Sequence, residues 1–288
     1  MLLATKLHVP RAQPGFVARP RLSARLDEGL ARRLILVCAP AGYGKTELLA
    51  AWASGGQRPV AWLSLDEGDN DPARFWRHVA AALERVCPGI SGRAGPLLGP
   101  PPPQSYEGVV TTLVNELAHP PAARQALLVL DDYHLISAQP VHAAVGFLLG
   151  HLPPGLRLVL ATRSDPPLRL GRLRARGELT ELRAGDLQFT EGEAAVLLRG
   201  AVGAAAPGLT EAAIEALTTR TEGWAAGLRL AGLSLQSQDD PAAFVAAFSG
   251  SHRYVLHYLA EEVLDRQDDQ VRVFLLETSV LDRLSGDL

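Results

Sequence analysis

The sequence predicts an α/β fold in which helices flank a parallel sheet, followed by a region made only of helices. Over the first 185 residues, short apolar runs bounded by turn residues alternate with helical patterns, as expected for buried parallel strands joined by helices. A glycine-containing loop follows the first of these runs and opens a helix. Beyond residue 185 the strand-like runs stop, and helical patterns continue to near residue 277.

The elements of the first region follow from its apolar runs. After the mostly irregular residues 1–20, a helix is expected at 21–30 and the first strand at Leu34–Cys38. Further strands are expected at 60–64, 127–131, 156–162 and, more weakly, 179–183. Helices are expected near 46–54, 72–86, 105–118 and 138–150. Residues 88–104, which include four consecutive prolines, are expected to form a long surface loop.

The helical region opens at Thr190-Glu191-Gly192-Glu193, which has the spacing of a capping box. Further helices are expected at 210–221, 223–236, 240–249, 253–265 and 267–277. The Ala/Gly/Pro-rich residues 202–209 and residues 236–241 are expected to be linkers.

Composition and charge exclude several classes of protein. Of the 288 residues, 47% are hydrophobic and 20% charged, an ordinary globular balance, and the net charge of −3 argues against nucleic-acid binding by the whole chain. Two cysteines, Cys38 and Cys87, are too few for a disulfide framework or a zinc cluster, which favours a reducing compartment. Because there is no signal-peptide pattern and no apolar stretch of about 20 residues, we predict a cytoplasmic protein.

The loop after the first strand carries the clearest functional signal. Its residues are Ala39, Pro40, Ala41, Gly42, Tyr43, Gly44, Lys45 and Thr46. They match the P-loop pattern G-x-x-x-x-G-K-[ST], except that Ala39 replaces the first glycine. In such loops backbone N–H groups face the phosphates, the lysine bridges the β- and γ-phosphates, and the hydroxyl ligates Mg²⁺. We therefore predict a P-loop NTPase sheet that binds ATP or ADP with Mg²⁺; a glycine-rich turn with a surface lysine is disfavoured, because strand, loop and helix occur in the required order.

A second motif follows a later strand, where four apolar residues lead into Asp131 and Asp132. This is the Walker B arrangement, in which a buried strand brings a carboxylate beside the P-loop. Asp131 is the predicted Mg²⁺ partner, directly or through water, and Asp132 stands where related ATPases carry the base that polarises water. A pair of aspartates that only caps the strand end is the alternative.

The third candidate is Arg163, which follows the strand expected at 156–162. The carboxyl ends of strands are where open α/β sheets bind ligands, and a guanidinium pairs well with phosphate. Arg163 could therefore sense the γ-phosphate. A surface arginine that pairs with Asp165 is an equally good interpretation of the sequence.

Together these motifs resemble a known family, the MalT-like, large ATP-binding LuxR-type transcriptional regulators. These belong to the signal-transduction ATPases with numerous domains (STAND). The resemblance is carried by residues 2–7, 39–46, 62–70, 130–134, 162–167, 172–177, 223–228 and 258–276. Each motif alone is weak, but their combination is specific, and the alanine at position 39 is common in this family.

The resemblance implies a slow ATPase that acts as a switch. In such proteins ADP holds a closed monomer, and ATP plus an inducer permits self-assembly. Their order of domains implies a nucleotide-binding domain at 1–185, a helical subdomain at 186–250 and the start of a winged helix at 251–288. The helical-repeat sensor and the C-terminal helix-turn-helix, through which alone the family binds DNA, are expected beyond this chain.

The resemblance also implies three further site residues. Trp224 lies where related switches close over the adenine, although a plain core tryptophan is the alternative. Arg19, before the first helix, is a second candidate near the adenine. Asp66 could lie near the phosphates, or the Asp66–Asn70 turn could simply cap the helix that begins near Pro72.

Rival functions remain open at this point. A small-molecule kinase would need an acceptor pocket and an arginine-rich lid, for which the stretch from Arg163 to Arg176 is the candidate; this stretch could instead be a solvated face or dock an acidic surface. The third interpretation is an interaction module that nucleotide stabilises but that does not turn nucleotide over. The eight histidines have no metal-ligand spacing, there is no G-x-S-x-G motif, and the acidic region 251–288 disfavours DNA contact.

Overall fold

The computed structural model of the chain describes residues 3–11, 13, 15–100, 103–118, 125–202, 209–236, 241–248, 253–264 and 269–279. It divides into two compact units, Met1–Gln188 and Phe189–Leu288. All strands of the described residues lie in the first unit, and the described part of the second unit is helical. No helix among the described residues is long and apolar enough to span a membrane.

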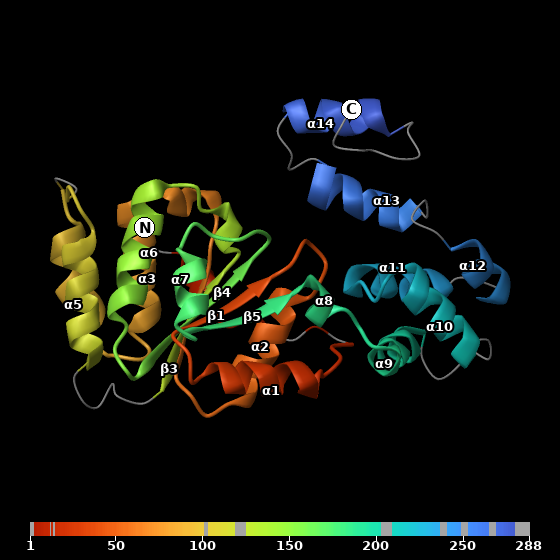
Figure 1. The fold of residues 1–288 in the computed structure, drawn as a ribbon, viewed down its shortest axis with the longest axis horizontal. Helices are drawn as coiled ribbons and strands as arrows, with labels where there is room; N and C mark the ends of the chain where they lie inside the picture. The colour runs from red at the N-terminus through yellow and green to blue at the C-terminus, as the bar shows by residue number, and fades with distance from the viewer. Residues whose placement is uncertain are drawn as a thin grey trace. The chain divides into compact units, whose positions relative to one another are not determined.

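The first unit is built on a five-stranded parallel sheet (Figure 1). Its strands are β1 Leu34–Cys38, β2 Val60–Ser64, β3 Ala126–Asp131, β4 Leu156–Thr162 and β5 Leu179–Arg183. Their spatial order is β2-β3-β4-β1-β5, and every pair is parallel. The predicted α/β class and the predicted strands are confirmed. The loop that follows β1 and the acidic residues at the end of β3 lie at the same edge of the sheet. One strand, β4, lies between them.

Alternate residues of the buried strands pack against helices on opposite faces of the sheet. On one face, Ile35 and Val37 pack with apolar residues of α1 (Pro20–Gly29) and α2 (Lys45–Gly55). On the other, Leu34 and Leu36 pack with apolar residues of α3 Pro72–Leu83, α5 Glu107–Ala118 and α6 Gln139–His151. Figure 1 shows these two layers on either side of the sheet. The continuous apolar runs of the strands follow from this burial on both faces.

The prediction of a long surface loop over residues 88–104 was wrong for its first part. The structure has α4 at Ile90–Ala94 and a 3₁₀ turn, η3, at Gly95–Leu98. Ile90, Ala94 and Leu98 recur every four residues, and each is at most 1% exposed. Burial of this one apolar stripe against the core stabilises a short helix that the nearby glycines and prolines obscured. Pro101 and Pro102 lie outside the described residues.

Two other short helices were not predicted. α7 spans Leu170–Ala175 and α8 spans Ala184–Leu187, on either side of β5. Leu170, Leu173 and Leu187 anchor them in the core. Helices this short lack a repeating apolar face that a sequence pattern could reveal.

The second unit consists of short helices in its described parts. They are α9 Glu191–Val202, α10 Glu211–Arg220, α11 Ala225–Leu235, α12 Pro241–Ala247, α13 Arg253–Leu259, the π-helical turn Ala260–Leu264 and α14 Asp269–Thr278. The predicted capping box before α9 is present: the Glu193 N–H donates to Thr190 Oγ1 over 3.3 Å, and the Thr190 N–H donates to the Glu193 carboxylate over 3.1 Å. Most of the two predicted linkers falls outside the described residues.

Candidate phosphate-binding site

The loop between β1 and α2 has the backbone of a P-loop. Gly42 and Gly44 adopt φ angles of 78° and 73°, in the left-handed region that side chains other than glycine rarely enter. Gly44 stands at the N-cap of α2, and no side chain caps this end of the helix. The first N–H groups of a helix lack partners within it and attract anions. Ala39, at the position of the first glycine, is buried, and its N–H donates to the Thr162 carbonyl over 3.2 Å, which joins the loop to β4.

Lys45 is folded back onto the loop that precedes it. Its Nζ donates to the carbonyl oxygens of Ala39 and Pro40, over 2.7 and 2.9 Å, and the side chain is only 7% exposed. Burial lowers the pKa of Lys45, and the positive charge of Arg163 lowers this pKa further. The ammonium group is therefore a poorly solvated cation at the mouth of the loop, which favours an anion beside it.

Thr46 and Asp131 meet across the sheet edge. The Thr46 hydroxyl donates to Asp131 Oδ1 over 3.0 Å, and the aspartate is 2% exposed. Burial raises the pKa of Asp131 to about 7, and the nearby carboxylate of Asp132 adds to this rise. A hydroxyl and a carboxylate are hard oxygen donors of the kind that Mg²⁺ takes from a protein when phosphates and water supply its other ligands. The two residues therefore fit a magnesium–nucleotide site.

The side chain of Asp132 is exposed, whereas that of Asp131 is buried. The φ of Asp132, 57°, is in the left-handed region, and its side chain is 43% exposed. Its N–H donates to Asp131 Oδ1 over 3.1 Å, and its carboxylate lies 3.9 Å from Nδ1 of His134. A left-handed conformation in a residue other than glycine has a free-energy cost and is found mostly at functional sites. The turn directs one aspartate inward to Thr46 and leaves the next in contact with solvent.

Two arginines from distant parts of the first unit lie near the loop. Arg163 follows β4, and its charge acts on Lys45. Asp165, the alternative partner considered for Arg163, is ion-paired with Arg183 and lies 3.7 Å from Arg174. Arg19 is 3% exposed, and its Nη2 lies 3.4 Å from where a Cβ on Gly44 would be. The guanidinium of Arg19 therefore lies directly against the P-loop.

Trp224 belongs to the second unit, where it stands at the N-cap of α11. Its ring meets that of Tyr258 edge to face, with centroids 5.4 Å apart, and covers Gly227 of its own helix so closely that a Cβ there would lie 2.7 Å from the ring. Its predicted place over the adenine stays a prediction.

Sequence reasoning missed the role of Asn70. Its amide donates to the Leu135 carbonyl over 2.8 Å, and its amide oxygen accepts from the N–H groups of Ser137 and Ala138 over 2.7 and 2.9 Å. Asn70 thus ties the turn after β2 to the loop that follows Asp132. The signal available was its position just past a strand end in the region of family resemblance, but its partners lie more than 60 residues later in the sequence.

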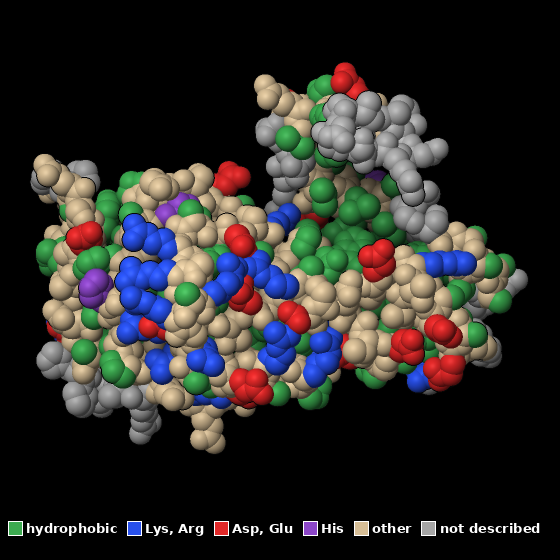
Figure 2. Space-filling model, in the orientation of Figure 1, with side chains coloured by type: hydrophobic (Ala, Val, Ile, Leu, Met, Phe, Trp, Pro, Cys, Tyr) green, Lys and Arg blue, Asp and Glu red, His purple; other side chains and the backbone are tan. Residues whose placement is uncertain are grey.

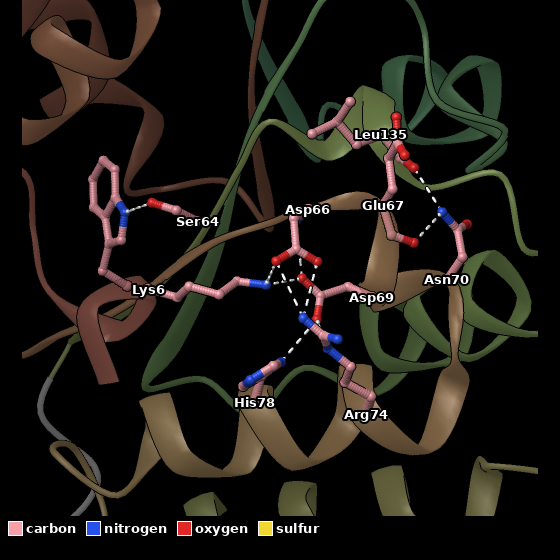
Figure 3. A network of polar contacts seen from close by, with 10 residues as sticks. Lys6, Ser64, Asp66, Glu67, Asp69, Asn70, Arg74, His78 and Leu135 are labelled. Carbon is pink, nitrogen blue, oxygen red and sulfur yellow. Dashed lines mark hydrogen bonds and ion pairs between the residues drawn. The ribbon is translucent and has the colours of Figure 1, made fainter. Parts of the chain in front are cut away.

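Asp66 lies in a network of charges beside this turn (Figure 3). Lys6, from the 3₁₀ turn Ala4–Leu7, pairs with Asp66 and with the fully buried Asp69, and Arg74 lies 3.2 Å from Asp66. His78 Nδ1 contacts the same Asp69 carboxylate over 2.8 Å. Asp66 and Asp69 also form a capping box around the turn η2, Glu67–Asn70. Asp66 therefore caps η2, whereas α3 is capped by Asp71, whose carboxylate accepts from the Arg74 N–H over 2.9 Å. The predicted place of Asp66 near the phosphates stays a prediction.

Comparison with known proteins supports the assignment of the P-loop. A family model described as an AAA domain matches residues 29–155, and one described as the MalT winged helix domain matches residues 260–288. The HTH-type transcriptional regulator MalT of Serratia proteamaculans is 37% identical over 294 residues, which cover 100% of this chain and 31% of the regulator. The serine/threonine-protein kinase PknK of Mycobacterium tuberculosis is 38% identical over 288 residues, 99% of this chain and 26% of the kinase.

Among solved structures, a Walker-type ATPase of Pyrococcus abyssi superposes with a TM-score of 0.57 and 13% identity, and the match covers 94% of this chain and 79% of that one. At this identity the likeness shows the fold alone. The chain spans between a quarter and a third of the length of the curated relatives named above. The sheet and the loop after β1 are those of a P-loop NTPase, and over its whole length the chain is similar to part of the MalT regulators.

Proposed function

We propose that this chain is the nucleotide switch of a MalT-like transcriptional regulator, in which the first unit binds ATP or ADP with Mg²⁺ and hydrolyses ATP slowly. The observation that carries the proposal is the 3.0 Å contact between Thr46 and Asp131 beside the buried Lys45. It brings together the three groups that a magnesium–nucleotide site requires, two from the start of α2 and one from the end of β3.

In this proposal each group has one task. Lys45 leaves the carbonyls of Ala39 and Pro40 and bridges the β- and γ-phosphates, while the N–H groups from Ala41 to Thr46 face them. Thr46 and Asp131 hold Mg²⁺, which neutralises charge on the phosphate oxygens. Asp132, whose side chain is exposed, positions the attacking water.

Two arginines complete the proposed site in the first unit. Arg163 contacts the γ-phosphate and so distinguishes ATP from ADP. Arg19 lies against Gly44 of the loop and is the second candidate for nucleotide contact. Asp132 is shorter than the glutamate of faster ATPases, so water is held less firmly and hydrolysis is slow.

The proposal extends to the protein that contains this chain. Residues 1–185 are the nucleotide-binding domain, 186–250 a helical subdomain and 251–288 the start of a winged helix. ADP favours a closed monomer, and ATP with an inducer favours self-association. DNA binding belongs to a C-terminal helix-turn-helix beyond residue 288, as the name of the MalT relative suggests, and the protein acts in the cytoplasm.

The name of the kinase PknK is a weaker guide to the function of this chain, because the match covers 26% of that kinase. This sequence has neither an H-R-D nor a D-F-G tripeptide, which a protein kinase uses to hold its catalytic base and magnesium. A small-molecule kinase and a binding module without turnover remain the rivals.

Calorimetry and phosphate release test the proposal. Lys45→Ala should abolish detectable binding of ATP and ADP in the presence of Mg²⁺, whereas Arg11→Ala, which removes an exposed cation elsewhere, should leave binding unchanged. Unchanged affinity in Lys45→Ala would refute the site. Phosphate release should be slow and independent of added small-molecule acceptors; transfer of phosphate to an acceptor would favour the kinase, and no release at all the binding module.

A further inference from the structure

A second concave site lies in the first unit, away from the P-loop. It is a groove of about 660 Å³ between α6 and the segment 167–176 that contains α7. No residue of 39–46 lines it. Its volume is within the range of roughly 300 to 1,000 Å³ that is usual for small-molecule sites. The nucleotide site therefore does not account for it.

The groove carries an excess of positive charge. Arg33, Arg169, Arg172 and Arg176 line it, against Glu107 and Glu178, so that four cations face two carboxylates. The whole chain has the opposite sign, with a net charge of −3. Figure 2 shows Lys and Arg side chains gathered on this face of the first unit, near α6 and α7. A local cationic site on an acidic chain selects for anions.

Three of these arginines are arranged as a set. Arg169 and Arg176 flank α7 at its two ends, Arg172 lies within it, and all three line the groove. All three are exposed, and among the described residues none of their guanidinium groups has a hydrogen bond or ion pair. Arg174, between them, instead pairs with Glu181. Arg174 therefore has a structural partner, whereas Arg169, Arg172 and Arg176 line the groove.

The rest of the groove is fixed in position. Arg33 Nη1 donates to the carbonyls of Leu149 and Gly150, over 3.2 and 3.1 Å, at the end of α6. His142 is 7% exposed, and its Nδ1 lies 2.9 Å from the Tyr133 hydroxyl. A preformed wall lowers the conformational entropy that the protein would lose when a ligand binds.

The backbone at the rim is strained. Arg169, at the N-cap of α7, has a φ of 54°. Such a conformation in a residue other than glycine is unfavourable and is found mostly at functional sites.

We propose that this groove binds a small organic polyanion, a molecule with two or more phosphoryl or carboxylate groups, through Arg169, Arg172 and Arg176. Guanidinium forks pair with both kinds of group in bidentate fashion. The hollow favours a small ligand over a protein surface, which needs a broad contact area rather than a confined volume. A duplex nucleic acid would bring many phosphates close to an acidic chain. The site is separate from the proposed nucleotide switch, because no residue of 39–46 lines it.

The test titrates inorganic tripolyphosphate and citrate, as the phosphoryl and carboxylate probes, into the full chain by calorimetry. All titrations use the Lys45→Ala background without Mg²⁺, so that the P-loop does not contribute. We expect one site for at least one probe. Arg172→Gln should weaken it about tenfold, as expected for loss of a charged hydrogen bond, and Arg172→Lys less. The charge-matched control Arg272→Gln, at an exposed position of α14, should leave affinity unchanged.

Three outcomes would overturn the proposal. These are the absence of binding by both probes, equal losses in Arg172→Gln and Arg272→Gln, and arginine-dependent binding of an acidic peptide or a DNA duplex with none of the small anions. Circular dichroism of each variant confirms that the fold is kept, and Arg169→Gln and Arg176→Gln give independent replicates at the same site. Whether wild type binds ATP is measured separately, so failure of the switch and failure of the groove are distinguishable.

Discussion

The adjacent residues Asp131 and Asp132 have opposite surroundings, and they should therefore respond differently to the same substitution. Asp131→Asn removes the buried carboxylate next to Thr46 and should weaken Mg²⁺-dependent nucleotide binding by about tenfold or more. Asp132→Asn should leave binding nearly unchanged and slow hydrolysis by about a hundredfold, the lower range for loss of a general base. Calorimetry and single-turnover phosphate release measure the two effects. If Asp132→Asn destroyed binding while Asp131→Asn spared it, the two roles would have to be exchanged.

A charged cluster on β5 gives a prediction for pH. The hydrogen bond from Arg174 to Glu181, helped by Arg183, lowers the pKa of Glu181 to about 2. Because this pKa is below the unfolded value of 4.5, the ionised Glu181 stabilises the fold above pH 4.5, and the contribution is lost as the pH falls toward 2. Since the pair is partly exposed, Glu181→Gln should cost about 1 kcal/mol at pH 7.

Urea unfolding of Glu181→Gln at several pH values measures this cost, which should shrink steadily below pH 4.5. Glu28→Gln, at an exposed position of α1, is the control and should have little effect at any pH. A cost for Glu181→Gln that is the same at pH 7 and pH 3 would contradict an origin in its charge.

The residues of the site differ in how well the sequence reveals them. Phosphate binding by a P-loop needs consecutive residues at fixed spacing, so Lys45 and Thr46 could be recognised directly. Asn70 could not, because its partners are set by the path of the chain in space. Arg19 was suggested only by family resemblance, and its contact with Gly44 requires the fold.

At the level of elements, buried strands were well predicted and short helices were not. Parallel strands covered on both faces are continuous apolar runs, and β1 is fully buried along its length. In α4 and η3 the buried apolar residues recur every fourth position, between glycines and a proline, and this pattern does not stand out against a loop. Their stability depends on the core they cover rather than on local propensity.

Two neighbouring leucines test this dependence on the core. Leu98 is 1% exposed, whereas Leu97 is 43% exposed on the same turn. Leu98→Ala should lower the free energy of unfolding by about 2 to 4 kcal/mol, because it leaves a cavity in the core. Leu97→Ala should change it by less than about 0.5 kcal/mol. Chemical denaturation measures the free energy of unfolding of the two variants. Equal decreases in this free energy would mean that residues 90–98 do not belong to the core.

For the whole molecule, nucleotide should stabilise the first unit selectively. ADP with Mg²⁺ at about one hundred times its dissociation constant should add about 2.7 kcal/mol to the stability of the unit that binds it. Hydrogen exchange should show this as slower exchange at 39–46 and at the ends of β3 and β4. Lys45→Ala should abolish the effect. Protection confined to the second unit would place the nucleotide elsewhere.

The sequence changes from strand patterns to helical patterns near residue 185, and the structure divides into two compact units after Gln188. The order of the strands was not visible. The sequence shows β2 between the two motif strands along the chain, whereas β4 lies between them in the sheet. Such an order depends on crossover connections, which leave no local pattern.

The order of the sheet also has a consequence for the synthesis of the protein. β1 leaves the ribosome first, but among the described strands its partners are β4 and β5, and more than one hundred residues separate it from β4. At the usual speed of translation this separation corresponds to roughly ten seconds. During that time a wholly apolar strand has no neighbour, while β2 and β3 can already pair. We therefore expect β1 to stay exposed in the nascent chain over this interval, and the Ala39 N–H can reach the Thr162 carbonyl only after Thr162 has emerged.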